Sequence, residues 1–173
     1  KMDYAALIRD LVAHFTAEEG CQVHLISHVI RPDASMARDD DHAAALRLAE
    51  EFPSVIVEEP AGDPSAAKSQ ISAMEFFFGA RMHACIAAFS SGVPVIPMAY
   101  SRKFIGLFGT LGYDRVADCR EEDADSVRRK IVEGYRDRAV LASEIATASV
   151  DIEARLSRYR AAIRSVLERT GRS

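Results

Sequence analysis

The chain has 173 residues, of which 49% are apolar, so it is long enough for one domain with a real core and too short for two full-sized domains. No apolar run approaches the roughly 20 residues that cross a bilayer, and the first residues lack a signal-peptide layout, so we expect a cytoplasmic protein that does not span the membrane. Its three cysteines, Cys21, Cys85 and Cys119, form no CxxC pair and indicate neither a zinc site nor a disulfide framework.

The charge is unevenly distributed along the chain. The net charge is −4, but residues 1–80 carry 6 basic and 14 acidic side chains, whereas residues 81–173 carry 16 basic and 12 acidic ones. The basic residues are interleaved with carboxylates rather than clustered, so nucleic acid is not expected as a partner. The positive half of the chain, which begins at Arg81, fits a small anionic ligand better.

The first half of the chain alternates predicted helices with predicted strands. Apolar residues at helical spacing predict a helix over residues 4–19, and "CQVHLISHVI" predicts a strand that ends near residues 28–30. "DDDHAAALRLAEEF" predicts a helix with a carboxylate-rich start, and "SVIVEE" a second strand. "PAGDP" reads as a loop and "SAAKSQISAM" as a short helix.

The second half continues the alternation and ends in a long helical pattern. "EFFFGA", "VPVIPMAY" and "YDRVADC" predict three further strands. Helices are expected over "RMHACIAAFSSG", which Gly92 would end, over "SRKFIGLFGTLG" and over residues 123–135. Apolar residues at steps of three, four or seven over residues 141–166 predict one long amphipathic helix or two consecutive ones, so we assign residues 138–170 to such a segment.

Strands that alternate with helices and are apolar on both faces require a parallel sheet covered on both sides. We therefore predict an α/β fold, a single Rossmann-like three-layer domain over residues 1–173 with a parallel sheet of about five strands. Ligands of such sheets bind outside the carboxyl ends of the strands. Four segments of this sequence reach that edge: residues 28–33, 58–63, 79–83 and 99–103.

One strand-to-helix junction carries the strongest candidates for chemistry. Gly79 would let the backbone turn tightly, the next helix offers unpaired N–H groups, and Arg81 suits a phosphate or carboxylate. With Arg81 at or before the N-cap, His83 can point at the same ligand and serve as a general acid or base. The alternative is structural: Arg81 pairs with a carboxylate such as Glu75, and His83 is an ordinary interior histidine.

Other residues at the same edge are weaker candidates. Tyr100, Ser101 and Lys103 open the following helix and form a second basic turn, which favours a ligand with more than one negative group. His28 lies at the end of the first predicted strand, where a structural role is the alternative. Residues 39–41, three consecutive aspartates, are most simply a helix N-cap with a solvated run. No spaced His/Cys/Asp cluster, GxGxxG, GxxxxGK[ST] or GxSxG motif is present, so no metal site is expected.

The run "FFFGARMHACIAAFSSGVPVIPMAYSRKFIGLFGTLGY", residues 76–113, resembles the polysaccharide pyruvyl transferase family. The family pattern is roughly G-x-R-L-H, a short apolar helix, G-V-P, a strand, and Y-D-x-K before a helix that ends in L-G. The matching positions here are Gly79, Arg81, His83, Gly92, Pro94, Tyr100, Lys103 and Gly112. Met82 replaces the usual leucine, and Ser101-Arg102 replaces Asp-x, so the role of that aspartate has no counterpart here.

The resemblance implies a GT-B-like enzyme that moves the enolpyruvyl unit of phosphoenolpyruvate onto a sugar of a surface polysaccharide. It implies that this chain is the C-terminal, donor-binding half of a longer protein, with the helical segment 138–170 packing back on an N-terminal half. Arg81 and His83 would be catalytic, and Gly79, Tyr100, Ser101, Lys103 and His28 would bind substrate. Phosphoenolpyruvate is then a substrate, no cofactor is expected, and the acceptor is a saccharide. A lipid-linked acceptor, and hence a place at the inner face of the membrane, is left open.

Two alternatives remain at this stage. The chain could be the nucleotide-sugar half of a GT-B glycosyltransferase or an epimerase relative, although such proteins often carry a glutamate on the helix after Arg81, and this helix has no acidic residue. The second alternative is a non-catalytic half-domain that binds an anion or serves for assembly.

Overall fold

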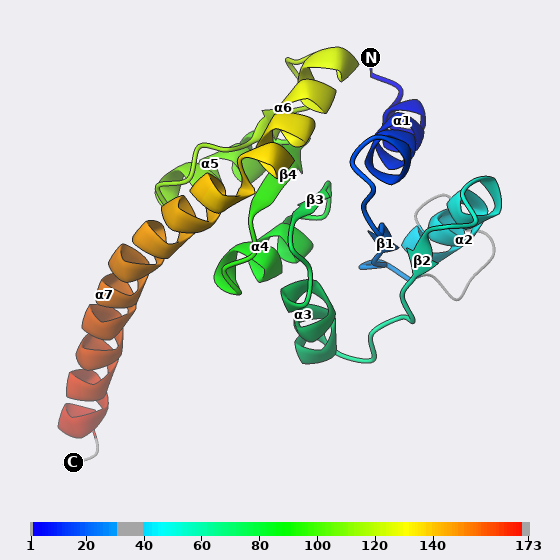
Figure 1. Cartoon of the computed structure of the whole chain (residues 1–173). Coiled ribbons are helices and arrows are strands. Elements are labelled where there is room, and N and C mark those ends of the chain that lie inside the picture. Colours follow the sequence, from blue (N-terminus) through cyan, green and yellow to red (C-terminus); the bar gives the residue numbers. More distant parts are fainter. Residues whose placement is uncertain (1, 31–39, 171–173) are drawn as a thin grey trace.

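The computed structural model describes residues 2–30 and 40–170, and its elements follow one another in the predicted order. They are α1 (Tyr4–Ala17), β1 (His24–Leu25), α2 (Asp41–Glu51), β2 (Ile56–Val57), α3 (Pro64–Ser72), β3 (Phe77–Gly79), α4 (Met82–Ser90), β4 (Val95–Ala99), α5 (Arg102–Thr110), β5 (Ala117–Asp118), α6 (Ala124–Arg136) and α7 (Arg138–Thr170) (Figure 1).

All strand pairs of the described chain are parallel, and the Rossmann-like α/β class is confirmed. The strands nevertheless form two sheets, β1–β2 and β3–β4–β5, instead of the one sheet that the sequence suggested. In the described chain no ladder joins β1 to β3, and residues of both strands line a cavity. The alternation of helix and strand thus predicted the fold class but not the break in the sheet.

The first strand is also shorter than predicted. It ends at Leu25 rather than near residues 28–30. The backbone N–H groups of His28 and Val29 donate to the Asp41 carboxylate, at 3.1 and 2.8 Å, so they take a side-chain partner in place of a strand partner. The residue His28 therefore lies on the loop that leaves β1, still on the side of its carboxyl end.

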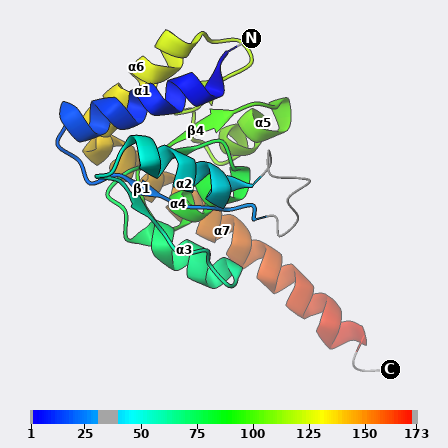
Figure 2. The ribbon, with the colours of Figure 1, turned by 90° about the vertical axis from the view of Figure 1, so that its right-hand side faces the viewer.

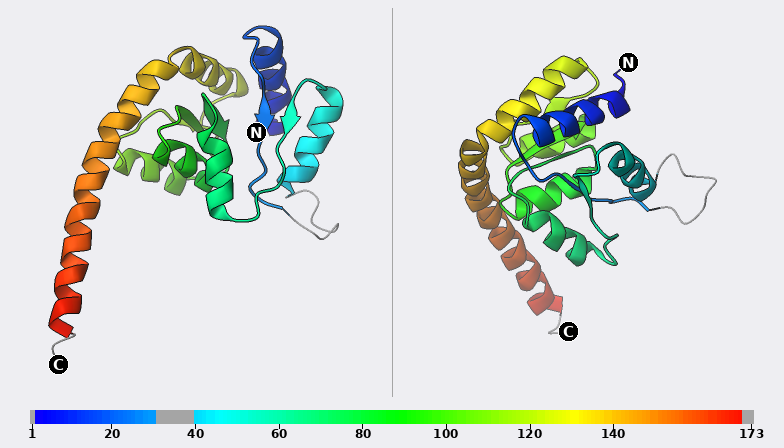
Figure 3. Two further views of the ribbon diagram at one scale, coloured as in Figure 1. Left: turned by 60° about the horizontal axis from the view of Figure 1, so that its bottom comes forward. Right: turned by 45° about the vertical axis from the view of Figure 1, so that its right-hand side comes forward.

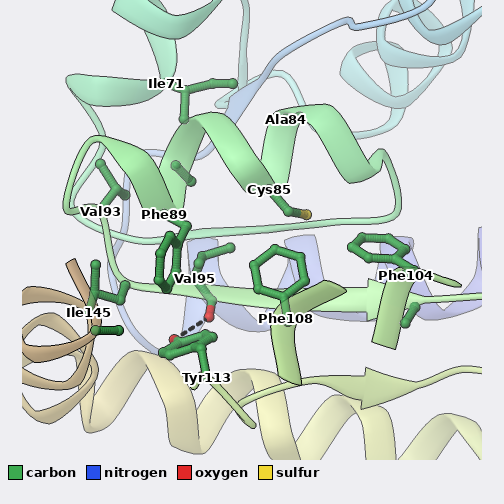
Figure 4. Close-up of a cluster of buried hydrophobic side chains, with 13 residues drawn as sticks. Ile71, Ala84, Cys85, Phe89, Val93, Val95, Phe104, Phe108, Tyr113 and Ile145 are labelled. Atoms are coloured by element: carbon green, nitrogen blue, oxygen red, sulfur yellow. Dashed lines mark hydrogen bonds between the residues drawn. The ribbon is translucent and has the colours of Figure 1, made fainter. Parts of the chain in front are cut away.

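The three-stranded sheet is the middle layer of the core. Successive residues of β4 face opposite sides, and all five are buried. Val95 and Ala99 join a cluster with α4, α5 and Tyr113, whose hydroxyl donates to the Val95 carbonyl oxygen at 2.6 Å (Figure 4). Ile96 and Met98 join a second cluster with α1 and α6. Helices thus cover both faces of this sheet, as the three-layer prediction requires.

On the second face, α1 lies alongside α6 (Figure 2). The two helices share buried leucine and isoleucine side chains, and ion pairs at their surface join Asp10 to Arg128 and Glu19 to Arg136. This packing places the first helix of the chain against its sixth. The two helices together cover the face of β4 that carries Ile96 and Met98.

Gly134 allows the close approach of α6 to β4. A Cβ atom at this position would lie 2.6 Å from Cγ1 of the buried Ile96 side chain. We expect Gly134→Ala to destabilise the fold by about 1–3 kcal/mol, despite the better helix propensity of alanine, because the core would be overpacked. The control is Gly106→Ala in α5, where no atom lies within 4 Å and a gain of up to about 1 kcal/mol is expected. Urea unfolding measures the change in the free energy of unfolding for each variant, and equal changes in the two variants would contradict this account.

The C-terminal segment is one helix, α7, rather than two consecutive helices. Its first turns bury Leu141 and Ile145 against the domain, whereas residues 153–169 are exposed and extend beyond the body (Figure 3). The exposed part carries Leu156, Tyr159, Ile163, Val166 and Leu167. In the part of the chain that is described, no helix is both long and apolar enough to cross a membrane.

Candidate active site

A cavity of about 1140 Å³ lies between the free edges of β1 and β3. Its lining includes the aromatic side chains of Phe15, Phe76 and Phe78 as well as polar ones. Four of the predicted site residues line it at the carboxyl ends of the strands: His28, Gly79, Arg81 and Tyr100. This end of the cavity is therefore the candidate site.

Arg81 is the N-cap of α4, as predicted, and its backbone is extended (φ −88°, ψ 109°). The extended backbone turns the guanidinium away from the helix axis towards α2. There Nη2 donates to Asp41 Oδ1 at 2.7 Å, and Nε donates to both carboxylate oxygens at 3.2 and 3.1 Å. The hydrogen-bonded carboxylate raises the pKa of Arg81 above its usual value. The alternative partner named from the sequence, Glu75, is wrong, and Arg81 is paired with Asp41.

The two candidate histidines lie next to each other although 55 positions separate them in the chain. Their rings are nearly parallel, at 18°, with centroids 6.1 Å apart. His28 is half-buried and His83 is exposed. Burial lowers the pKa of His28 below 6.5, and the neighbouring His83 and Arg81 lower it further, whereas the negative charge of Asp41 acts in the opposite direction. A neutral imidazole at His28 can accept or donate a hydrogen bond in the cavity.

Gly79 occupies its predicted place, but neither backbone strain nor crowding calls for a glycine there. Its φ is not positive, so the tight-turn argument is wrong; positive φ values occur at Gly20, Gly92 and Gly112. A Cβ atom at Gly79 would lie 3.4 Å from the Phe77 ring, which is an ordinary van der Waals contact. At Gly92, by contrast, the left-handed φ of 77° confirms the predicted end of α4.

The second basic turn is only partly directed at the cavity. Tyr100 lines the cavity, with its ring edge against Phe104. Ser101 is the N-cap of α5, and its Oγ accepts a hydrogen bond from the Phe104 N–H at 3.2 Å. Lys103 is exposed on the first turn of α5 and is not part of the cavity lining. Its role as a second anion contact stays a prediction.

The sequence did not reveal the role of Asp41. A solvated run was expected over residues 39–41; Asp39 lies outside the described residues, and Asp40 is indeed the N-cap of α2. For Asp41 the expectation is wrong, since its side chain is only 23% exposed and is paired with Arg81. No local pattern in the sequence marks Asp41 as the partner of Arg81, because the two residues are 40 positions apart.

The site thus joins the Arg81 guanidinium and the His28 imidazole, which line the cavity, with the N-terminus of α4 and the exposed imidazole of His83, which lies beside His28 but is not part of the cavity lining. Such groups can bind a small anion and move a proton beside it. Elsewhere, the described residues contain no group of three or more His, Cys, Asp or Glu side chains that could hold a metal ion.

The fold is that of a Rossmann-like α/β domain, with the candidate site at the carboxyl ends of its strands. Residues 3–102 match the family model for polysaccharide pyruvyl transferase, which is more than half of the chain, so the chain belongs to this family. Its members are transferases of polysaccharide biosynthesis, which implies a pyruvyl donor and a saccharide acceptor. Comparisons with curated proteins and with solved structures find no match.

Proposed function

We propose that this chain supplies the donor-binding half of an enzyme that transfers the enolpyruvyl unit of phosphoenolpyruvate to two hydroxyl groups of a saccharide. The observation that carries the proposal is the placement of Arg81, at the N-cap of α4, and of His28 in the lining of one cavity, with the exposed His83 beside His28. Phosphoenolpyruvate has a phosphate and a carboxylate, which guanidinium and helix N–H groups bind well.

The reaction balances with these groups. A proton is added to C3 of the enol and one sugar hydroxyl attacks C2; phosphate then leaves, and the second hydroxyl attacks the same carbon. Of the two hydroxyl protons, one replaces the proton given to C3 and the other goes to the departing phosphate. In this scheme His83 is the acid and base, Arg81 binds the phosphate or the carboxylate, and His28 is a second contact to the substrate.

The remaining candidates have supporting roles in the proposal. Gly79 and Tyr100 line the donor pocket, and Lys103 with the Ser101 turn offers a second positive contact. Phosphoenolpyruvate enters as a substrate, and no step requires a cofactor. The acceptor reaches the site from an N-terminal half on which the exposed apolar side chains of α7 pack. A lipid-linked acceptor would place the enzyme at the inner face of the membrane.

Calorimetry on the full-length enzyme tests the donor. We expect wild type to bind phosphoenolpyruvate, and Arg81→Ala to weaken that binding by about 10–100-fold, the effect of losing a hydrogen bond between charged groups. Arg115→Ala is the matched control, because Arg115 is ion-paired with Glu144 outside the cavity and should leave binding unchanged.

Two results would contradict the proposal. One is equal affinity of Arg81→Ala and wild type for phosphoenolpyruvate. The other is binding of UDP or GDP sugars in its place, which would favour the nucleotide-sugar alternative. Binding of phosphoenolpyruvate without phosphate release, in the presence of a saccharide acceptor, would indicate the non-catalytic alternative.

A further inference from the structure

The Asp41 carboxylate joins two segments that no strand ladder connects. Asp41 is the first residue of α2, and its Oδ2 accepts hydrogen bonds from the N–H groups of His28 and Val29 on the loop after β1. Its own N–H donates to the Val29 carbonyl oxygen at 2.8 Å. The same carboxylate accepts from Nε and Nη2 of Arg81 at the start of α4. Since β1 and β3 belong to separate sheets, these hydrogen bonds fix the loop that carries His28 relative to α4.

Within residues 2–30 and 40–170, every hydrogen bond to this carboxylate comes from an N–H donor. Two backbone amides and two nitrogen atoms of one guanidinium share its two oxygen atoms. Each oxygen atom accepts at least two of these hydrogen bonds, so an asparagine would turn its NH₂ group towards at least two donors and lose those contacts even though the shape is kept. The arrangement therefore depends on an ionised carboxylate rather than on a side chain of this size.

The contacts also fix the orientation of the guanidinium. Nε and Nη2 of Arg81 point at Asp41, and Nη1 takes no part in these hydrogen bonds. A bidentate contact of this kind holds the plane of the guanidinium in one orientation. The charge of Asp41 acts on His28 as well, together with those of His83 and Arg81.

We infer that Asp41 is a positioning residue of the site, which holds Arg81 and the His28 loop in the mutual arrangement that the reaction needs without itself contacting the substrate. This inference rests on the proposed function for its catalytic consequence. The structural part of the inference, which is the coupling of Asp41 to both His28 and Arg81, does not depend on the proposed function.

The first test is an NMR titration of the His28 imidazole in this chain, with no substrate present. Asp41→Asn removes a negative charge beside His28 and is expected to lower its pKa, because the imidazolium loses a favourable neighbour. Asp41→Glu keeps the charge and should leave the titration close to that of wild type. Asp123→Asn, at the N-cap of α6 and outside the cavity, is the matched control and should have no effect.

The second test is kinetic and uses the full-length enzyme with phosphoenolpyruvate and acceptor. Asp41→Asn is expected to lower kcat/KM for phosphoenolpyruvate about tenfold or more, because Arg81 loses its fixed orientation towards the substrate, and Asp41→Glu to restore part of the loss. In an Arg81→Ala background, Asp41→Asn should cost no more than about a twofold further loss, because residues that act as a unit are not additive. A residue that only supported folding would give the same loss in both backgrounds.

The outcomes separate the inference from the proposed function. An unchanged His28 titration and an additive loss with Arg81→Ala overturn the positioning role. If wild type releases no phosphate from phosphoenolpyruvate, the proposed function fails, while the His28 titration still decides whether Asp41 controls the site. Should Asp41→Asn not fold, Asp41→Glu decides by the same measurements: wild-type kcat/KM together with an altered His28 titration would contradict the inference.

Discussion

Replacing His83 with alanine in the full-length enzyme is expected to lower phosphate release from phosphoenolpyruvate by about 10²–10⁴-fold, the usual contribution of a general acid or base. His83 is exposed in the second position of α4 and lies beside His28, which lines the cavity. Its replacement removes no buried contact, so the fold should stay intact. The measurement is continuous detection of phosphate with saturating phosphoenolpyruvate and saccharide acceptor.

Two further variants complete this experiment. Ser90→Ala, exposed at the opposite end of α4, is the control for changes in the helix and should keep full activity. His83→Gln keeps the size and a hydrogen-bonding group but cannot relay a proton, so it should be as slow as His83→Ala. Wild-type rates in both His83 variants, together with a large loss in His28→Ala, would transfer the acid and base role to His28.

The features that the sequence predicted correctly are those set by local chemistry. The order of helices and strands follows from apolar spacing within each segment, and the stop at Gly92 follows from one left-handed residue. The position of Arg81 at the N-cap of α4 could be predicted because a strand that turns into a helix leaves the N–H groups of the first turn unpaired. For α7, the absence of proline and glycine between residues 138 and 170 agrees with a single helix.

The features that were missed depend on pairs far apart in the chain. The contact of Asp41 with Arg81 spans 40 positions, and no local pattern separates it from the solvated aspartate that was expected. The Asp41 carboxylate also explains the early end of β1, because it accepts hydrogen bonds from the N–H groups of His28 and Val29. The break between β1 and β3 is likewise a property of the packed molecule, since each strand has an ordinary sequence for its class.

The aromatic cluster beneath α4 and α5 connects the core to the site. Phe89 on α4 packs edge-on against Phe108 on α5, with ring centroids 6.0 Å apart, and Phe108 also contacts Phe104 and Tyr113 (Figure 4). The N-terminus of α4 presents Arg81 and His83, and that of α5 presents Ser101 and Lys103. The packing of these rings therefore determines how the two helix starts are placed relative to each other.

Phe108→Ala is expected to lower the free energy of unfolding by about 3–5 kcal/mol, because a fully buried ring is lost and the cavity left behind closes only in part. That loss is a large part of the roughly 5–15 kcal/mol that stabilises a domain. Urea unfolding should show a lower midpoint with an unchanged slope. Thr110→Ala on the same helix is the control, since Thr110 is exposed and its hydroxyl bonds only to the Leu107 carbonyl oxygen. A loss below about 1 kcal/mol would show that α5 does not depend on this cluster. The placement of Ser101 and Lys103 beside α4 would then need another cause.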